Sequence, residues 1–125
     1  MVDGKNKGTG FEDLEVWQYS IALSKQIYQI TGKFPREEIY GLTNQMRRCS
    51  VSIASNLAEG SVRGSKYFSR FVTMSLGSSA ELKTQLIIAK EIGFLKETEY
   101  KNLLEDANRI GRMLKGLKSS LRERV

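Results

Sequence analysis

The sequence predicts an all-α protein with the architecture of an antiparallel up-and-down four-helix bundle. Apolar residues recur at steps of three and four through four long segments, whereas strand-like alternation with turn dipeptides is missing. The connections between these segments are short, which favours antiparallel neighbours. At 125 residues the chain can bury one core without disulfides or metal. We therefore expect a single domain over residues 11–125, preceded by a disordered, polar tail over residues 1–10.

The first two helices are predicted over residues 13–31 and 41–59. Asp13 is a plausible N-cap, Gly32 and Gly60 are plausible stops, and Pro35 prevents smooth continuation between the two helices. The core stripe of the second helix contains Leu42, Met46, Cys49, Ile53 and Leu57. Roughly opposite this stripe lie Val51, Ala54 and Ala58. A second face of small and apolar residues indicates a helix packed on two sides, and we expect these three residues to form an interface between protomers.

The third and fourth helices are predicted over residues 65–91 and 98–122. Ser65 is the expected N-cap of the third helix, and Gly93 is its expected stop. The segment 75–81 is rich in small residues, so we expect it to cross the similarly small segment 52–56 at close approach. The fourth helix has the most regular apolar stripe, which consists of Leu103, Ala107, Ile110, Leu114, Leu117 and Leu121.

The composition argues against catalysis. Histidine is absent and Cys49 is the single cysteine, which removes histidine-based nucleophile activation, imidazole ligands and multi-cysteine metal sites. We expect no enzymatic activity, no cofactor and no metal. Glu59 and Glu81 are expected to pair with Arg48 or Arg63 rather than to act as acid and base. Because no signal peptide and no membrane-spanning run is recognisable, we expect a cytoplasmic protein without membrane contact.

The net charge of +6 is concentrated in two segments, residues 35–70 and 96–125. Such asymmetry favours a polyanionic partner. No base-reading motif is recognisable, so we expect contacts to the phosphate backbone of RNA or DNA. The candidate phosphate-binding residues are Arg47, Arg48, Arg63, Lys66, Arg70, Arg109, Arg112, Lys115, Lys118 and Arg122. Two alternatives remain: a protein-docking scaffold whose basic face binds an acidic partner, and a merely solvated helix surface.

Five stretches carry a resemblance to a known family, and they span nearly the whole chain after the tail. They read FEDLEVWQ (11–18), FPREEIYGLTNQMRR (34–48), SIASNLAEG (52–60), SRFVTMSLGSSAEL (69–82) and EIGFL (91–95). The chain resembles the four-helix bundle proteins encoded by intervening sequences of bacterial 23S rRNA, which are related to the accessory variability determinant of diversity-generating retroelements. The resemblance implies a ring-shaped homo-oligomer, a homopentamer, with a basic surface. For the retroelement relatives it implies binding of nucleic acid and of a reverse transcriptase.

Overall fold

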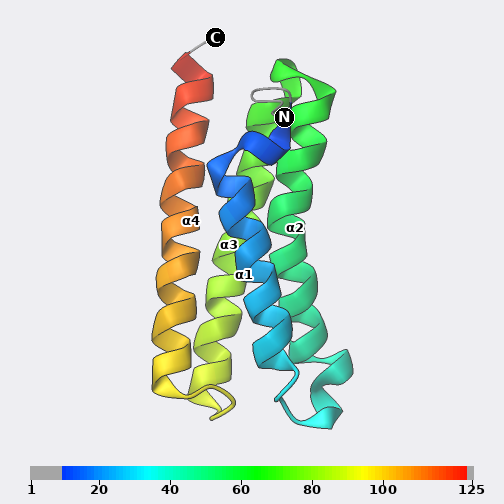
Figure 1. The fold of residues 1–125 in the computed structure, drawn as a ribbon, viewed down its shortest axis with the longest axis vertical. Helices are drawn as coiled ribbons and strands as arrows, with labels where there is room; N and C mark the ends of the chain where they lie inside the picture. The colour runs from blue at the N-terminus through cyan, green and yellow to red at the C-terminus, as the bar shows by residue number, and fades with distance from the viewer. Residues whose placement is uncertain (1–9, 124–125) are drawn as a thin grey trace, which may run out of the picture.

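The computed structural model describes the backbone of residues 10–123 and the side chains of residues 10–121, and in this part of the chain it is all-helical. The four long helices are α1 (Glu15–Thr31), α2 (Leu42–Arg63), α3 (Ser65–Glu91) and α4 (Glu97–Glu123). Successive helices run in opposite directions along the bundle (Figure 1). The expected four-helix bundle is confirmed. The tail predicted over residues 1–10 lies outside the described residues except for Gly10.

Short 3₁₀ helices precede both α1 and α2. Residues Phe11–Asp13 form η1, so Asp13 is not the N-cap of α1: this position belongs to Leu14, which has extended backbone angles. The second short helix, η2 (Arg36–Tyr40), follows Pro35 and bridges the two long helices. Gly32 directly follows α1, as predicted. Glu12 and Asp13 thus belong to a separate turn before α1, and the N-cap residue Leu14 makes no side-chain cap hydrogen bond.

The end predicted for α2 at Glu59 is wrong, because Gly60 lies inside the helix. A Cβ atom built on Gly60 would lie 2.5 Å from Cβ of Phe71, so the missing side chain allows α2 and α3 to approach. The helix continues to Arg63 and ends at Gly64, whose φ of +105° suits glycine. The predicted N-cap at Ser65 is also wrong, since Gly64 occupies that position and Ser65 is the first residue of α3.

The core lies between all four helices and follows the predicted stripes. Fully buried large side chains come from every helix: Leu23, Ile27, Met46, Ile53, Leu57, Val72, Leu82, Leu86, Ile110 and Leu114. The small segments of α2 and α3 cross as expected. Ser75 Oγ donates a hydrogen bond to the carbonyl of Ile53 at 2.8 Å, and the hydroxyl groups of Ser52 and Ser78 contact each other. Small side chains therefore give this helix pair both close packing and polar contacts.

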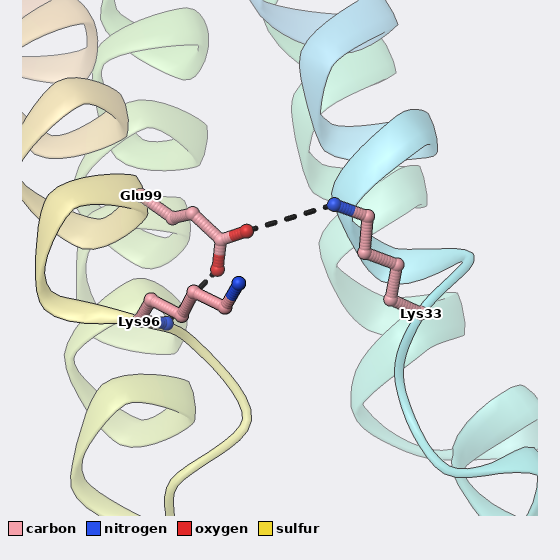
Figure 2. A network of polar contacts seen from close by, with 3 residues as sticks. All are labelled: Lys33, Lys96 and Glu99. Carbon is pink, nitrogen blue, oxygen red and sulfur yellow. Dashed lines mark hydrogen bonds and ion pairs between the residues drawn. The ribbon is translucent and has the colours of Figure 1, made fainter.

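The connection between α3 and α4 fixes the start of α4. Gly93 has a φ of +89°, and the N–H groups of Gly93 and Phe94 donate to the carbonyls of Lys90 and Ala89, which is the Schellman arrangement of a helix end. At the start of α4, the Glu99 carboxylate accepts a hydrogen bond from the backbone N–H of Lys96 at 2.9 Å. Its other oxygen lies 3.7 Å from Lys33 Nζ, which follows α1 (Figure 2). Glu99 thus joins α4 to the end of α1.

Candidate nucleic-acid interface

A basic groove runs between α3 and α4. It has a volume of about 680 Å³ and is lined on one wall by residues of α3 between Thr73 and Lys83, and on the other by residues of α4 between Ala107 and Lys115. Three exposed cations line it, Lys83 from α3 and Arg112 and Lys115 from α4, and none of its lining residues is acidic. A hollow lined by one sign of charge concentrates the electrostatic field, so this groove attracts anions.

A second group of cations, termed the basic end, lies at the end of the bundle where α2 turns into α3. It comprises Arg63, Lys66 and Arg70 near this turn, and Lys118 near the C-terminal end of α4. Figure 1 shows the C-terminal end of α4 at the same end of the bundle as the turn between α2 and α3. Helix register agrees: the Cβ position of Gly111 lies 3.9 Å from Ser79 Oγ, so Lys118, seven residues further along antiparallel α4, is level with residue 72 of α3. The basic end therefore continues into the basic groove.

Most of these cations have no acidic partner among residues 10–121. Arg63 forms an ion pair with Glu59 at 2.9 Å, which confirms the predicted pairing of these two residues. Within the described part of the chain no ion pair engages Lys66, Arg70, Lys83, Arg112, Lys115 or Lys118. Lys66 lies over the ring of Tyr67, and Arg63 over that of Phe71. Among the described residues, the positive charge at this end of the bundle is thus largely without ion-pair partners.

Three predicted contact residues, Arg47, Arg48 and Arg109, are not brought into this group. Arg47 is half-buried: its guanidinium donates to Thr31 Oγ1 at 2.9 Å and to the Tyr28 carbonyl at 3.3 Å, so it closes the end of α1. Arg48 is exposed but lies fifteen residues before Arg63 on the same helix, which is about 22 Å along its axis. Arg109 lies over the ring of Tyr19 on the α1 side. The side chain of Arg122 lies outside the described residues.

Lys83, which lines the α3 wall of the groove, was not among the predicted contact residues. Residues 71–95 have no net charge, so the distribution of charge along the chain did not indicate a basic surface in this segment. The spacing does indicate that Lys83 shares a helix face with two groove residues, because Leu76, Ala80 and Lys83 follow one another at steps of four and three on one side of α3. Placing this stripe beside α4 would have required the helix register.

The environment of Cys49 favours its protonated thiol. Burial, and secondarily the Glu81 carboxylate, raise the pKa of the Cys49 thiol from 9.0 to about 12. The thiol donates a hydrogen bond to the Ser78 carbonyl at 3.0 Å. Glu81 and Arg48 line one cavity beside this cysteine, but no ion pair joins these two residues, contrary to one of the predicted pairings. A protonated, hydrogen-bonded thiol is unreactive, so Cys49 acts as a packing residue.

The residues predicted at a protomer interface, Val51, Ala54 and Ala58, lie together along a groove between α1 and α2. Phe11, Trp17, Ile21, Ser24 and Ser55 complete its lining. Val51 and Ile21 are exposed, Ala58 is half-buried and Ala54 is already buried within the protomer. The hydroxyl of Ser24 is buried, and in the described part of the chain it has no hydrogen-bond partner. This apolar groove lies on a different side of α2 from the basic end.

The described residues offer neither a metal-binding cluster nor a membrane-spanning helix. They contain no group of three or more histidine, cysteine, aspartate or glutamate side chains arranged to hold a metal ion. None of the helices within residues 10–123 combines the length and the apolar character needed to span a bilayer.

The family of this chain follows from its similarity to known proteins. The model of the 23S rRNA-intervening sequence protein family matches residues 12–116. The chain belongs to this family, as the resemblance of its motifs predicted. A search of curated protein sequences gives no significant match.

A solved structure shares the fold. It is the crystal structure of a protein with unknown function from the S23 ribosomal protein family of Bacteroides thetaiotaomicron VPI-5482. The similarity has a TM-score of 0.72 at 17% sequence identity, and it covers 82% of this chain and 97% of the other. The likeness therefore concerns the arrangement of the helices.

Proposed function

We propose that this protein is a non-catalytic nucleic-acid-binding module of the cytoplasm that contacts the phosphate backbone through its basic end. The cations Arg63, Lys66, Arg70 and Lys118 would make the first contacts, with Lys115 and Arg112 extending them along α4. The observation that supports this proposal is that cations from three helices gather at one end of the bundle. Among these six residues, only Arg63 forms an ion pair in the described part of the chain. RNA and DNA offer the same phosphate chemistry to such a surface.

Local helix stability does not account for the cations at the start of α3. The N-terminal turns of a helix carry the positive end of its dipole and favour acidic residues. The first turn of α3 contains no acidic residue and includes Lys66, and Arg70 follows one turn later. On α4, by contrast, cations near the C-terminus are favourable for the helix itself. Lys66 and Arg70 are therefore the residues for which an anionic ligand is the better explanation.

We further propose that protomers associate as a ring, a pentamer as the family resemblance implies. The support is the apolar groove between α1 and α2, with exposed Ile21 and Val51. A ring would repeat the basic end on every protomer, so that contacts that are weak singly would act together on one long polyanion. A reverse transcriptase is the protein partner that the retroelement relatives suggest for such a ring.

The test is fluorescence anisotropy of nuclease-treated protein with labelled structured RNA and duplex DNA over a range of salt concentrations. Backbone contact predicts that the logarithm of the affinity for the duplex falls linearly with the logarithm of the salt concentration, by about 0.9 per phosphate neutralised. We expect the double variant Lys66→Glu/Arg70→Glu to lower the affinity by about tenfold or more and to reduce this slope by about two.

A matched control separates a local site from net charge. Lys25 and Lys101 are also exposed but lie outside the basic end, and Lys25→Glu/Lys101→Glu changes the net charge by the same amount. This control should retain most of the affinity. Equal losses in both double variants would refute a localised site. No binding of either polymer by the unaltered protein near physiological salt would refute the proposed function and favour an acidic protein partner.

A further inference from the structure

Two glycines of the basic groove have no role in the packing of the protomer. A Cβ atom built on Gly77 of α3 would meet nothing within 4 Å, and one built on Gly111 of α4 would meet only Ser79 Oγ, at 3.9 Å. Glycine inside a helix costs about 1 kcal/mol relative to alanine. The bundle itself therefore does not require glycine at either position. Both residues line the groove between α3 and α4, one from each wall.

The groove has the length of a few helical turns and an apolar floor. Its α3 wall extends from Thr73 to Lys83, eleven residues that span about 15 Å at 1.5 Å per residue. Leu76, Ala80 and Ala107 provide its apolar surface. None of the lining residues is aromatic, so nucleic-acid bases would find no stacking platform here. A narrow floor of small and apolar residues instead suits a polypeptide backbone that packs closely.

The charges at the rim select the sign of the occupant. Lys83 stands on one wall and Arg112 and Lys115 on the other, with no acidic residue between them. The N-terminal residues 1–9 of this chain carry Asp3 against Lys5 and Lys7, so their net charge has the wrong sign to fill the groove. An occupant that packs against the apolar floor and pairs with the cations at the rim has a seam of apolar residues flanked by carboxylates.

We propose that the groove between α3 and α4 docks one amphipathic α-helix of a partner protein, with a seam of small apolar residues and acidic flanks. Gly77 and Gly111 let the backbone of this helix approach both walls, while Lys83, Arg112 and Lys115 pair with its carboxylates. Such helix-in-groove recognition places anchor residues at steps of three and four along the ligand. This docking goes beyond nucleic-acid binding and leaves the basic end free.

The test uses a labelled 14-residue peptide held helical by a side-chain staple, with alanine and leucine along one face and glutamate on both flanks. We expect the unaltered protein to bind it, with amide chemical-shift changes concentrated on residues 73–83 and 107–115. The variant Gly77→Leu/Gly111→Leu keeps every cation but fills the groove, so the affinity should fall at least about tenfold. Leucine favours helix over glycine, and the space at both positions is open, so the variant should fold.

Gly116→Leu is the matched control, because Gly116 is also an α4 glycine with open space around it but does not line the groove. It should bind the peptide normally. Equal binding by the groove-filled variant, or equal binding of a peptide with lysine in place of glutamate, would overturn the proposal, as would absence of binding to the unaltered protein. If filling the groove instead changes the oligomeric state measured by light scattering, its occupant is a second copy of this chain. Arg63, Lys66, Arg70 and Lys118 lie outside the groove, so the groove-filled variant should keep most of its nucleic-acid affinity and lose at most the contribution of Arg112 and Lys115. A loss of peptide binding with nucleic-acid binding largely retained therefore separates this proposal from the proposed function.

Discussion

Single glycines serve opposite purposes in this bundle. At Gly60 a methyl group would collide with Phe71 across the interface of α2 and α3, whereas at Gly77 it would enter open space. The first position is required by packing inside the protomer, and the second is not. A residue that looks the same in the sequence therefore carries different physical constraints.

We predict opposite stability changes for alanine at these two sites. Gly60→Ala should lower the free energy of unfolding by about 1 to 3 kcal/mol, because Cβ of Phe71 belongs to the helix and can yield only if α3 moves. Gly77→Ala should raise it by about 0.5 to 1 kcal/mol through helix propensity. Urea denaturation followed by circular dichroism measures both. A stabilising effect of Gly60→Ala would contradict the packing role.

Sequence reasoning could not assign Gly60 correctly, because a glycine near the end of an apolar pattern is most often a helix stop. What overrides that expectation is the proximity of α3, which is a tertiary contact. Gly64, four residues later, has the positive φ that ends the helix. The apolar stripes, by contrast, depend only on helical periodicity, and for this reason the core residues and the crossing of the two small segments were predictable.

At the scale of helices, the start of α4 is only half capped. Glu99, the third residue of the helix, accepts the backbone N–H of Lys96, as in a capping box. Lys96 cannot return the contact, since its ammonium group is a donor and not an acceptor. The neighbouring salt bridge to Lys33 adds little, because the Lys33 side chain is 72% exposed.

We predict that Lys96→Ser completes this capping box and raises the free energy of unfolding by about 0.5 to 1 kcal/mol. Glu99→Ala should lower it by about 0.5 to 1 kcal/mol, since it removes the existing half of the box. Lys33→Ala is the control and should change it by less than about 0.5 kcal/mol. Thermal and urea unfolding monitor all three variants. A loss as large in Lys33→Ala as in Glu99→Ala would assign the effect to the ion pair rather than to the cap.

On the scale of the whole molecule, the basic groove and the apolar groove lie between different pairs of helices. Cations gather at the basic end and along the basic groove, while the apolar groove lies between α1 and α2. Which of the ten predicted cations converge could not be read from the sequence, because the answer depends on the register of α3 against α4. Arg47 illustrates the difficulty, since its charge is engaged by the end of α1.

The proposed ring predicts that Val51→Glu dissociates the assembly and leaves the protomer helical. Val51 is 41% exposed within the protomer, so a carboxylate there should destabilise only the contact between protomers. Ala54 is 5% exposed, so a charge at that position would also disturb the fold of the protomer. Light scattering coupled to size exclusion measures the mass. Ile87→Glu is the control, because Ile87 is similarly exposed on α3 and does not line the apolar groove. An unchanged oligomer in Val51→Glu would remove the α1–α2 groove from the interface.

The single-residue connection at Gly64 affects how the chain acquires its structure. Since Gly64 alone separates α2 from α3, bringing these helices together closes almost no loop, whereas ten residues separate α1 from α2 and five separate α3 from α4. The entropy lost on closing a loop grows with its length, so this helical hairpin is the least costly pair to assemble from the unfolded chain. The two helices also approach closely, at Gly60 and Phe71. Local connection and close contact thus coincide in α2 and α3, which gives α1 and α4 a template on which to fold.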